Sequence, residues 1–231
     1  MHESTRTPAA GRDGTADPSA HPGSTPVLLA CGAAAGPLFV LSVVLQESVR
    51  EGFDPRYHAL SQLALGAEGW VQTATFIVAG LLAVASAVGL RRALQRAALG
   101  ARWGPILIGG YGIGLIWGGL FATDPALGFP PGTPDGMPAS MSWHATLHGF
   151  APMLTGLALI AACVVFALRF RRQGRRGWAT SSAIVPIAYL ALGFAAFPAD
   201  DLRLLLAGGA IIWLWASALT LRILLDHRGA K

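Results

Sequence analysis

Two histidines four residues apart, His144 and His148 in the stretch SWHATLHGF, have a spacing that fits metal chemistry. On a helix, positions four apart face the same side, so both imidazoles can approach one ion. Asp124 and His58 are the candidate further ligands of a zinc site that keeps one position open for water. The glutamate of the HExxH motif is missing, because Ala145 follows the first histidine.

A hydrolase built on this site would also need a general base or a nucleophile. The carboxylates that can serve as the base are Glu47, Glu68 and Asp201. Ser61 is the hydroxyl that would complete a set of His, Asp and Ser. The competing interpretation is structural: Asp124 caps a turn, and the histidines lie at a membrane interface, where amphipathic rings are well accommodated.

The elements that must position these residues are membrane spans. Of the 231 residues 53% are hydrophobic and 13% are charged, and the mean hydropathy is +0.53, which excludes an ordinary soluble domain. Six uncharged apolar segments are each long enough to cross a bilayer as a helix. These segments are residues 27–45, 70–90, 104–122, 147–168, 178–197 and 204–221. The predicted fold class is therefore all-α, an integral membrane bundle of six transmembrane helices.

Basic residues divide unevenly between the two sides of this bundle. Fourteen of the 17 Lys and Arg fall on the side of both termini and three on the other, so both termini are predicted to be cytoplasmic. The net charge of +5 comes from arginines beside helix ends, where they set topology and contact lipid headgroups. The bilayer is therefore the expected partner, and a nucleic acid is not expected.

The chain divides into three predicted regions. Residues 1–26 are rich in Pro, Gly, Ser and Thr and predict a disordered cytoplasmic tail, residues 27–225 form the transmembrane domain, and residues 226–231 form a second cytoplasmic tail. In the first external loop, PRYHALSQLALGAEGW is amphipathic and predicts a short interfacial helix that caps the bundle.

Small residues predict close helix packing in the third span. Gly110, Gly114 and Gly118 recur every four residues and form one smooth face. Packing against another helix of the same chain is the favoured interpretation. A second copy of the chain, giving a homo-oligomer, is the alternative.

Three stretches of the sequence resemble a known family. HALSQLALGAEGWVQTATFIVAGLLAVASAVGLRRAL, GLFATDPALGFPPGTP and SWHATLHGF resemble, in order and spacing, the bacterial membrane family called domain of unknown function 998, over roughly residues 27–225. The resemblance implies a multi-pass bacterial membrane protein and carries no established activity or catalytic residue.

The sequence predicts a location more sharply than an activity. We expect a plasma-membrane protein with a polar extracytoplasmic mouth that acts as a noncatalytic binding or accessory protein. The sequence does not identify its ligand, which can be a small molecule or a lipid. The alternative is a metal-dependent membrane hydrolase acting on a lipid or another amphiphile, with zinc as cofactor.

Overall fold

The computed structural model describes residues 24–94 and 102–229 and is all-helical within these ranges. Its helices are α1 (Ser24–Val49), the 3₁₀ helix η1 (Leu60–Ala64), α2 (Gly69–Leu94), α3 (Trp103–Leu120), α4 (Trp143–His148), α5 (Phe150–Arg172), α6 (Arg176–Ala196) and α7 (Arg203–Gly229). With α4 and α5 taken together, the described residues contain six helical segments long and apolar enough to span a membrane. The predicted fold class is therefore confirmed.

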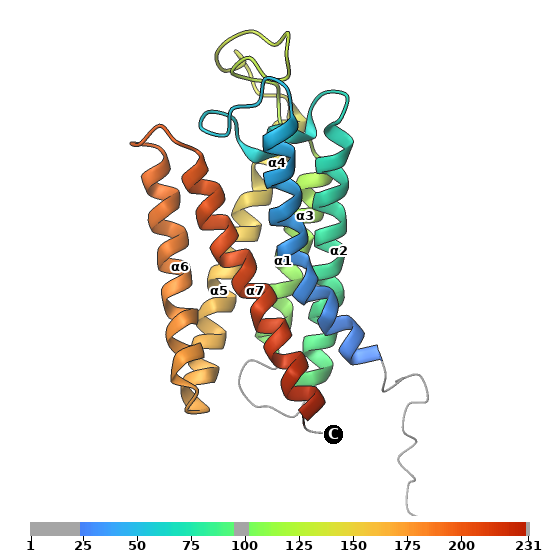
Figure 1. Cartoon of the computed structure of the whole chain (residues 1–231), viewed down its shortest axis with the longest axis vertical. Coiled ribbons are helices and arrows are strands. Elements are labelled where there is room, and N and C mark those ends of the chain that lie inside the picture. Colours follow the sequence, from blue (N-terminus) through green and yellow to red (C-terminus); the bar gives the residue numbers. More distant parts are fainter. Residues whose placement is uncertain (1–23, 95–101, 230–231) are drawn as a thin grey trace, which may run out of the picture.

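The six spans form a ring in chain order. Each span packs against the next one, and α7 returns to pack against α1. One end of the ring, the loop end, carries residues 50–68, 121–142 and 197–202, and the opposite end, the termini end, carries Ser24 and Gly229 (Figure 1). In the same view α7 runs obliquely, from beside α6 at the loop end to the termini end (Figure 1).

Close packing between α1 and α7 depends on two glycines of α1. A Cβ atom on Gly32 would lie 2.5 Å from the Cβ of Ser86 in α2, and one on Gly36 would lie 2.7 Å from the carbonyl oxygen of Trp213 in α7. The hydroxyl of Ser217 accepts a hydrogen bond from the Gly36 N–H at 2.9 Å and donates one to the Gly32 carbonyl at 2.8 Å. The two backbones meet here because neither glycine has a side chain.

The predicted glycine face of α3 packs inside the chain, against α5. A Cβ atom on Gly114 would lie 2.4 Å from Oγ1 of Thr155, while one on Gly110 would lie 3.6 Å from the Cβ of Ala158. The tighter contact is therefore at the middle glycine. Internal packing thus accounts for this stripe without a second copy of the chain.

The helix ends differ from the predicted boundaries. The helix α1 begins at Ser24, three residues before the predicted span, and the rest of the predicted tail, residues 1–23, lies outside the described residues. The helix α7 continues to Gly229, so residues 226–229 are helical instead of forming a separate tail. Asp226 supports this extension, because its carboxylate pairs with Arg222 one turn earlier and with Arg175 at the start of α6.

Candidate functional site

A buried histidine joins two loops at the loop end. Nδ1 of His58 accepts a hydrogen bond from the backbone N–H of Asp54 at 2.8 Å, and Nε2 lies 2.9 Å from the carbonyl oxygen of Leu127. A carbonyl oxygen only accepts, so Nε2 must carry the proton and the ring is neutral. Both ring nitrogens are thus engaged, and His58 fastens the first loop to the loop between α3 and α4.

The short helix η1 also contributes to the contact between these two loops. Gln62 accepts a hydrogen bond from the N–H of Ala59 at 2.9 Å and donates one to the carbonyl oxygen of Ala126 at 3.1 Å. Arg50 donates to the carbonyl oxygens of Leu63 and Leu65 at 2.9 and 2.6 Å. The first loop therefore caps the bundle as predicted, and two polar side chains of the region point inward instead of toward solvent.

His148 differs from His58 because only one of its two ring nitrogens has a hydrogen-bond partner among the described residues. Its Nδ1 lies 2.7 Å from the carbonyl oxygen of Phe121, so this nitrogen must donate. In the neutral ring, Nε2 then keeps its lone pair, and the His148 side chain lines a cavity. His144 lies elsewhere: it is stacked on the neighbouring indole of Trp143, with ring centroids 3.6 Å apart.

Asp124 is hydrogen-bonded to Ser142, the residue that precedes α4. Its carboxylate accepts a hydrogen bond from the Ser142 N–H at 2.7 Å, and the hydrogen bonds from Ser142 hold the pKa of Asp124 below its usual value. Ser142 in turn caps α4, because its hydroxyl accepts from the N–H of Ala145 at 3.1 Å. Asp124 therefore fixes the start of the helix that carries both paired histidines.

The four predicted metal ligands are not gathered around one point. Within residues 24–94 and 102–229 no group of three or more His, Cys, Asp or Glu side chains is placed to hold a metal ion. His58 and Asp124 already have the backbone partners described above. Metal binding by His58, Asp124, His144 and His148 stays a prediction without a common centre to support it.

Two of the four predicted catalytic residues, Glu68 and Asp201, are engaged in ion pairs. Glu68 is largely exposed and lies 3.4 Å from Nε of Arg50. Asp201 pairs with Arg203 at 2.6 Å, and this arginine lowers the pKa of the carboxylate. The other two, Ser61 in η1 and Glu47 in α1, line the cavity described below.

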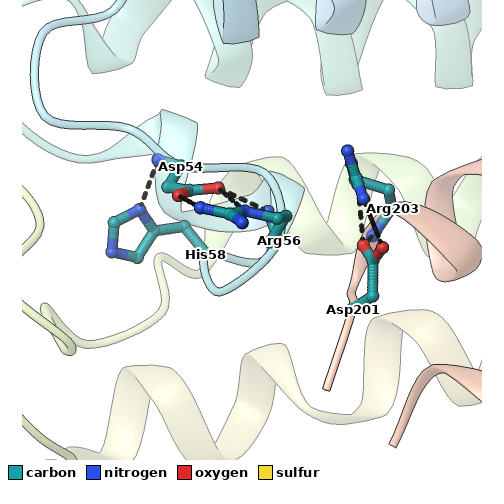
Figure 2. A network of polar contacts seen from close by, with 5 residues as sticks. All are labelled: Asp54, Arg56, His58, Asp201 and Arg203. Carbon is teal, nitrogen blue, oxygen red and sulfur yellow. Dashed lines mark hydrogen bonds and ion pairs between the residues drawn. The ribbon is translucent and has the colours of Figure 1, made fainter. Parts of the chain in front are cut away.

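Two ion pairs lie near each other at the loop end of the bundle (Figure 2). Asp54 pairs with Arg56 at 3.0 Å in the first loop, as Asp201 does with Arg203 between α6 and α7. The backbone links the two loops as well, because the N–H of Leu202 donates to the carbonyl oxygen of Arg56 at 2.8 Å. Each arginine thus neutralises a carboxylate two residues away, and the backbone hydrogen bond ties residues 197–202 to the first loop.

A cavity of about 290 Å³ opens in the loop half of the ring. It extends along α1 from Phe39 to Glu47, about 12 Å at the rise of an α-helix, and along α7 from Leu205 to Trp213. Phe39 and Trp213 meet edge to face at its floor, with ring centroids 4.7 Å apart. The lining is mostly apolar. Its side chains able to form hydrogen bonds through oxygen or nitrogen include those of Glu47, His58, Ser61, His148, Thr155, Tyr189 and Trp213.

Sequence reasoning found some of these lining residues and missed others. Ser61 and His148 were candidates because of their types, and Glu47 was noted as a carboxylate closing the first span. Thr155 and Tyr189 were missed. Their only signal in the sequence is a hydroxyl inside an apolar span, which also fits a residue bonded to its own helix.

Comparison with known proteins gives a family but no activity. The model of a family described as "Protein of unknown function (DUF998)" matches residues 33–222. No curated protein and no solved structure matches the chain.

Proposed function

We propose a binding function for this chain, which belongs to the DUF998 family of proteins of unknown function and is a multi-pass membrane protein. In this proposal it binds an amphiphile in the loop-end cavity and catalyses no reaction on it. The cavity is the observation that carries the proposal, because about 290 Å³ with a mostly apolar lining is close to the lower size limit of small-molecule sites.

The depth of the cavity favours an alkyl chain as occupant. About 12 Å along α1 is close to the thickness of one leaflet, which is roughly half of a hydrocarbon core of about 30 Å. A chain bound there would be surrounded by Phe39, Phe76, Leu115 and Leu206, while Glu47, His58 and Ser61 lie nearer the loops. An amphiphile matches this order of apolar floor and polar entrance.

The polar residues near the cavity favour binding over catalysis. His58 has both ring nitrogens engaged with backbone groups, and Asp124 is engaged with Ser142. Glu68 and Asp201 are paired with arginines outside the cavity lining. These side chains support the architecture of the loop end, and a hydrolase would have to break such contacts to use them.

A cavity-filling variant tests the binding function. A fatty alcohol carrying a diazirine in its chain is the probe, added to the full-length protein in nanodiscs of zwitterionic phospholipid. Wild-type protein should be labelled on α1 and α7 at cavity-lining residues, mapped by mass spectrometry. Leu206→Trp should reduce this labelling severalfold, since the indole occupies the cavity.

The matched control is Leu214→Trp, on the same helix but facing outward, with 42% of Leu214 exposed. This variant should be labelled like the wild type. Equal labelling of the cavity residues in both variants, or labelling restricted to lipid-facing side chains, would contradict the proposed function.

We further propose that the loop end faces the outside of a bacterial plasma membrane. Of the 13 basic residues that the structure describes, ten lie toward the termini end and three at the loop end, the pattern of cytoplasmic loops. In a variant whose Cys31 and Cys163 are replaced by Ala, a new cysteine at Gly132 should react with a membrane-impermeant thiol reagent in intact cells. A new cysteine at Gly174 should not, and the reverse pattern would overturn this orientation.

A further inference from the structure

We infer that the amphiphile in the loop-end cavity carries a cationic head group and that Glu47 binds this group. The inference rests on the binding function proposed above and names its ligand class. Glu47 lies in the last turn of α1, is half-buried and lines the cavity at its loop end. An ionisable group at the edge of a membrane span is costly unless something compensates it.

Glu47 has no compensating partner in the part of the chain that the structure describes. No hydrogen bond or ion pair joins its carboxylate to another residue of the ranges 24–94 and 102–229. The arginines of the loop end pair with other carboxylates, Arg50 with Glu68, Arg56 with Asp54, and Arg203 with Asp201. A charge left unpaired in a binding cavity is the natural position for a ligand of opposite charge.

The described lining of the cavity offers an anionic head group no positively charged side chain. Among the described residues that line it, none is Lys or Arg, and Glu47 is the one carboxylate. Ser61 and, in the neutral form of the ring, Nε2 of His148 add hydrogen-bond acceptors to the same lining, and an ammonium group is a donor. The side chains of the lining thus complement a cation and would repel a phosphate, sulfate or carboxylate.

The surrounding charge points in the same direction. Eight Asp and Glu residues lie at the loop end, against three arginines, a formal net charge of −5 there in a chain whose total is +5. A negative field of this kind raises the local concentration of cations and steers them toward the entrance. The head group would remain near Glu47, while its chain extends toward Phe39 and Trp213 at the floor.

Competition between amphiphiles of identical chain tests this inference. Dodecylammonium, dodecanol and dodecyl sulfate are each used to displace the diazirine-bearing fatty alcohol from full-length protein in zwitterionic nanodiscs at fixed ionic strength. We expect dodecylammonium to compete at a concentration about tenfold lower than dodecanol, and dodecyl sulfate to compete worst. Glu47→Gln should remove the advantage of the ammonium compound, so that dodecylammonium and dodecanol compete at similar concentrations.

Glu51→Gln is the matched control, because Glu51 is an exposed carboxylate four residues further along, outside the cavity lining. This variant should keep the ammonium preference, and a melting curve checks that both variants are folded. If dodecanol competes as well as dodecylammonium, or if the two Glu→Gln variants behave alike, the cationic ligand is excluded while chain binding stands. If the probe labels no cavity residue in the wild type, the binding function itself fails.

Discussion

The loop half and the termini half of the bundle are built from the same six spans but are filled differently. In the termini half, Phe166, Phe170 and Leu219 are fully buried or nearly so, and the space among Gly32, Ser86, Thr220 and their neighbours is only about 10 Å³, although a separate hollow of about 240 Å³ opens nearer the helix ends, beside Phe170 and Asp226. In the loop half the ring encloses about 290 Å³. Residue size explains part of the difference, because α1 presents glycine to α7 at Gly32 and Gly36 but a large ring at Phe39.

The two halves are also held together by different interactions. Helices in lipid gain little from hydrophobic association, so close van der Waals packing stabilises the termini half. At the loop end, hydrogen bonds from the side chains of His58 and Gln62 to backbone groups join the first loop to residues 121–142, and those of Arg50 hold the first loop together internally. The comparison indicates that a site can exist in one half because the other half supplies the stability.

The largest effect is expected at Gly32, where α1 packs tightly against α2 and α7. Gly32→Leu should lower the free energy of unfolding by about 3 kcal/mol or more, because even a Cβ atom would lie 2.5 Å from Ser86 and 2.9 Å from Thr220. The measurement is the melting temperature and monodispersity of the purified protein in detergent. Ala34→Leu is the control, since Ala34 is exposed on the same helix. Equal stability of the two variants would show that the termini half is not the tightly packed part.

A smaller and local effect is expected in the polar half. His58→Ala removes the hydrogen bonds to Asp54 and Leu127, which should cost about 1–2 kcal/mol and increase hydrogen exchange in residues 121–142. Exchange in the termini half of α5 and α7 should be unchanged. His144→Ala is the comparison, because that ring is stacked on Trp143 and no hydrogen bond to it is found among the described residues. Equal exchange in the two variants would remove the special role of His58.

The smallest effect is expected from titration of Asp124. The pKa of its carboxylate is lower in the folded protein, mainly through the hydrogen bonds from Ser142, so its contribution is fully present above the ordinary value of about 3.9. The contribution is lost as the pH falls through the folded-state pKa. Asp124→Asn should therefore make the order of residues 121–142 less dependent on pH below about 4, as measured by hydrogen exchange. An unchanged acid dependence in this variant would show that other carboxylates control the loop.

The sequence determined those properties that depend on runs of neighbouring residues. Each of the six spans is visible as an uncharged apolar segment, because the bilayer selects hydropathy and length within the segment itself. The glycine face of α3 was predictable for the same reason, since Gly110, Gly114 and Gly118 lie on one helix with regular spacing. The end of the bundle at which polar residues gather followed from counting spans.

The tertiary structure decided which polar residues share a site. His58 and His148 lie at the same end of the bundle. Both ring nitrogens of His58 are hydrogen-bonded to backbone groups, whereas only Nδ1 of His148 is, and no local sequence pattern predicts this difference. The cavity likewise depends on where α7 crosses α1, and its floor joins Phe39 to Trp213, 174 residues away. Contacts between distant residues follow from the packing of whole helices, so hydropathy and spacing along the chain cannot specify them.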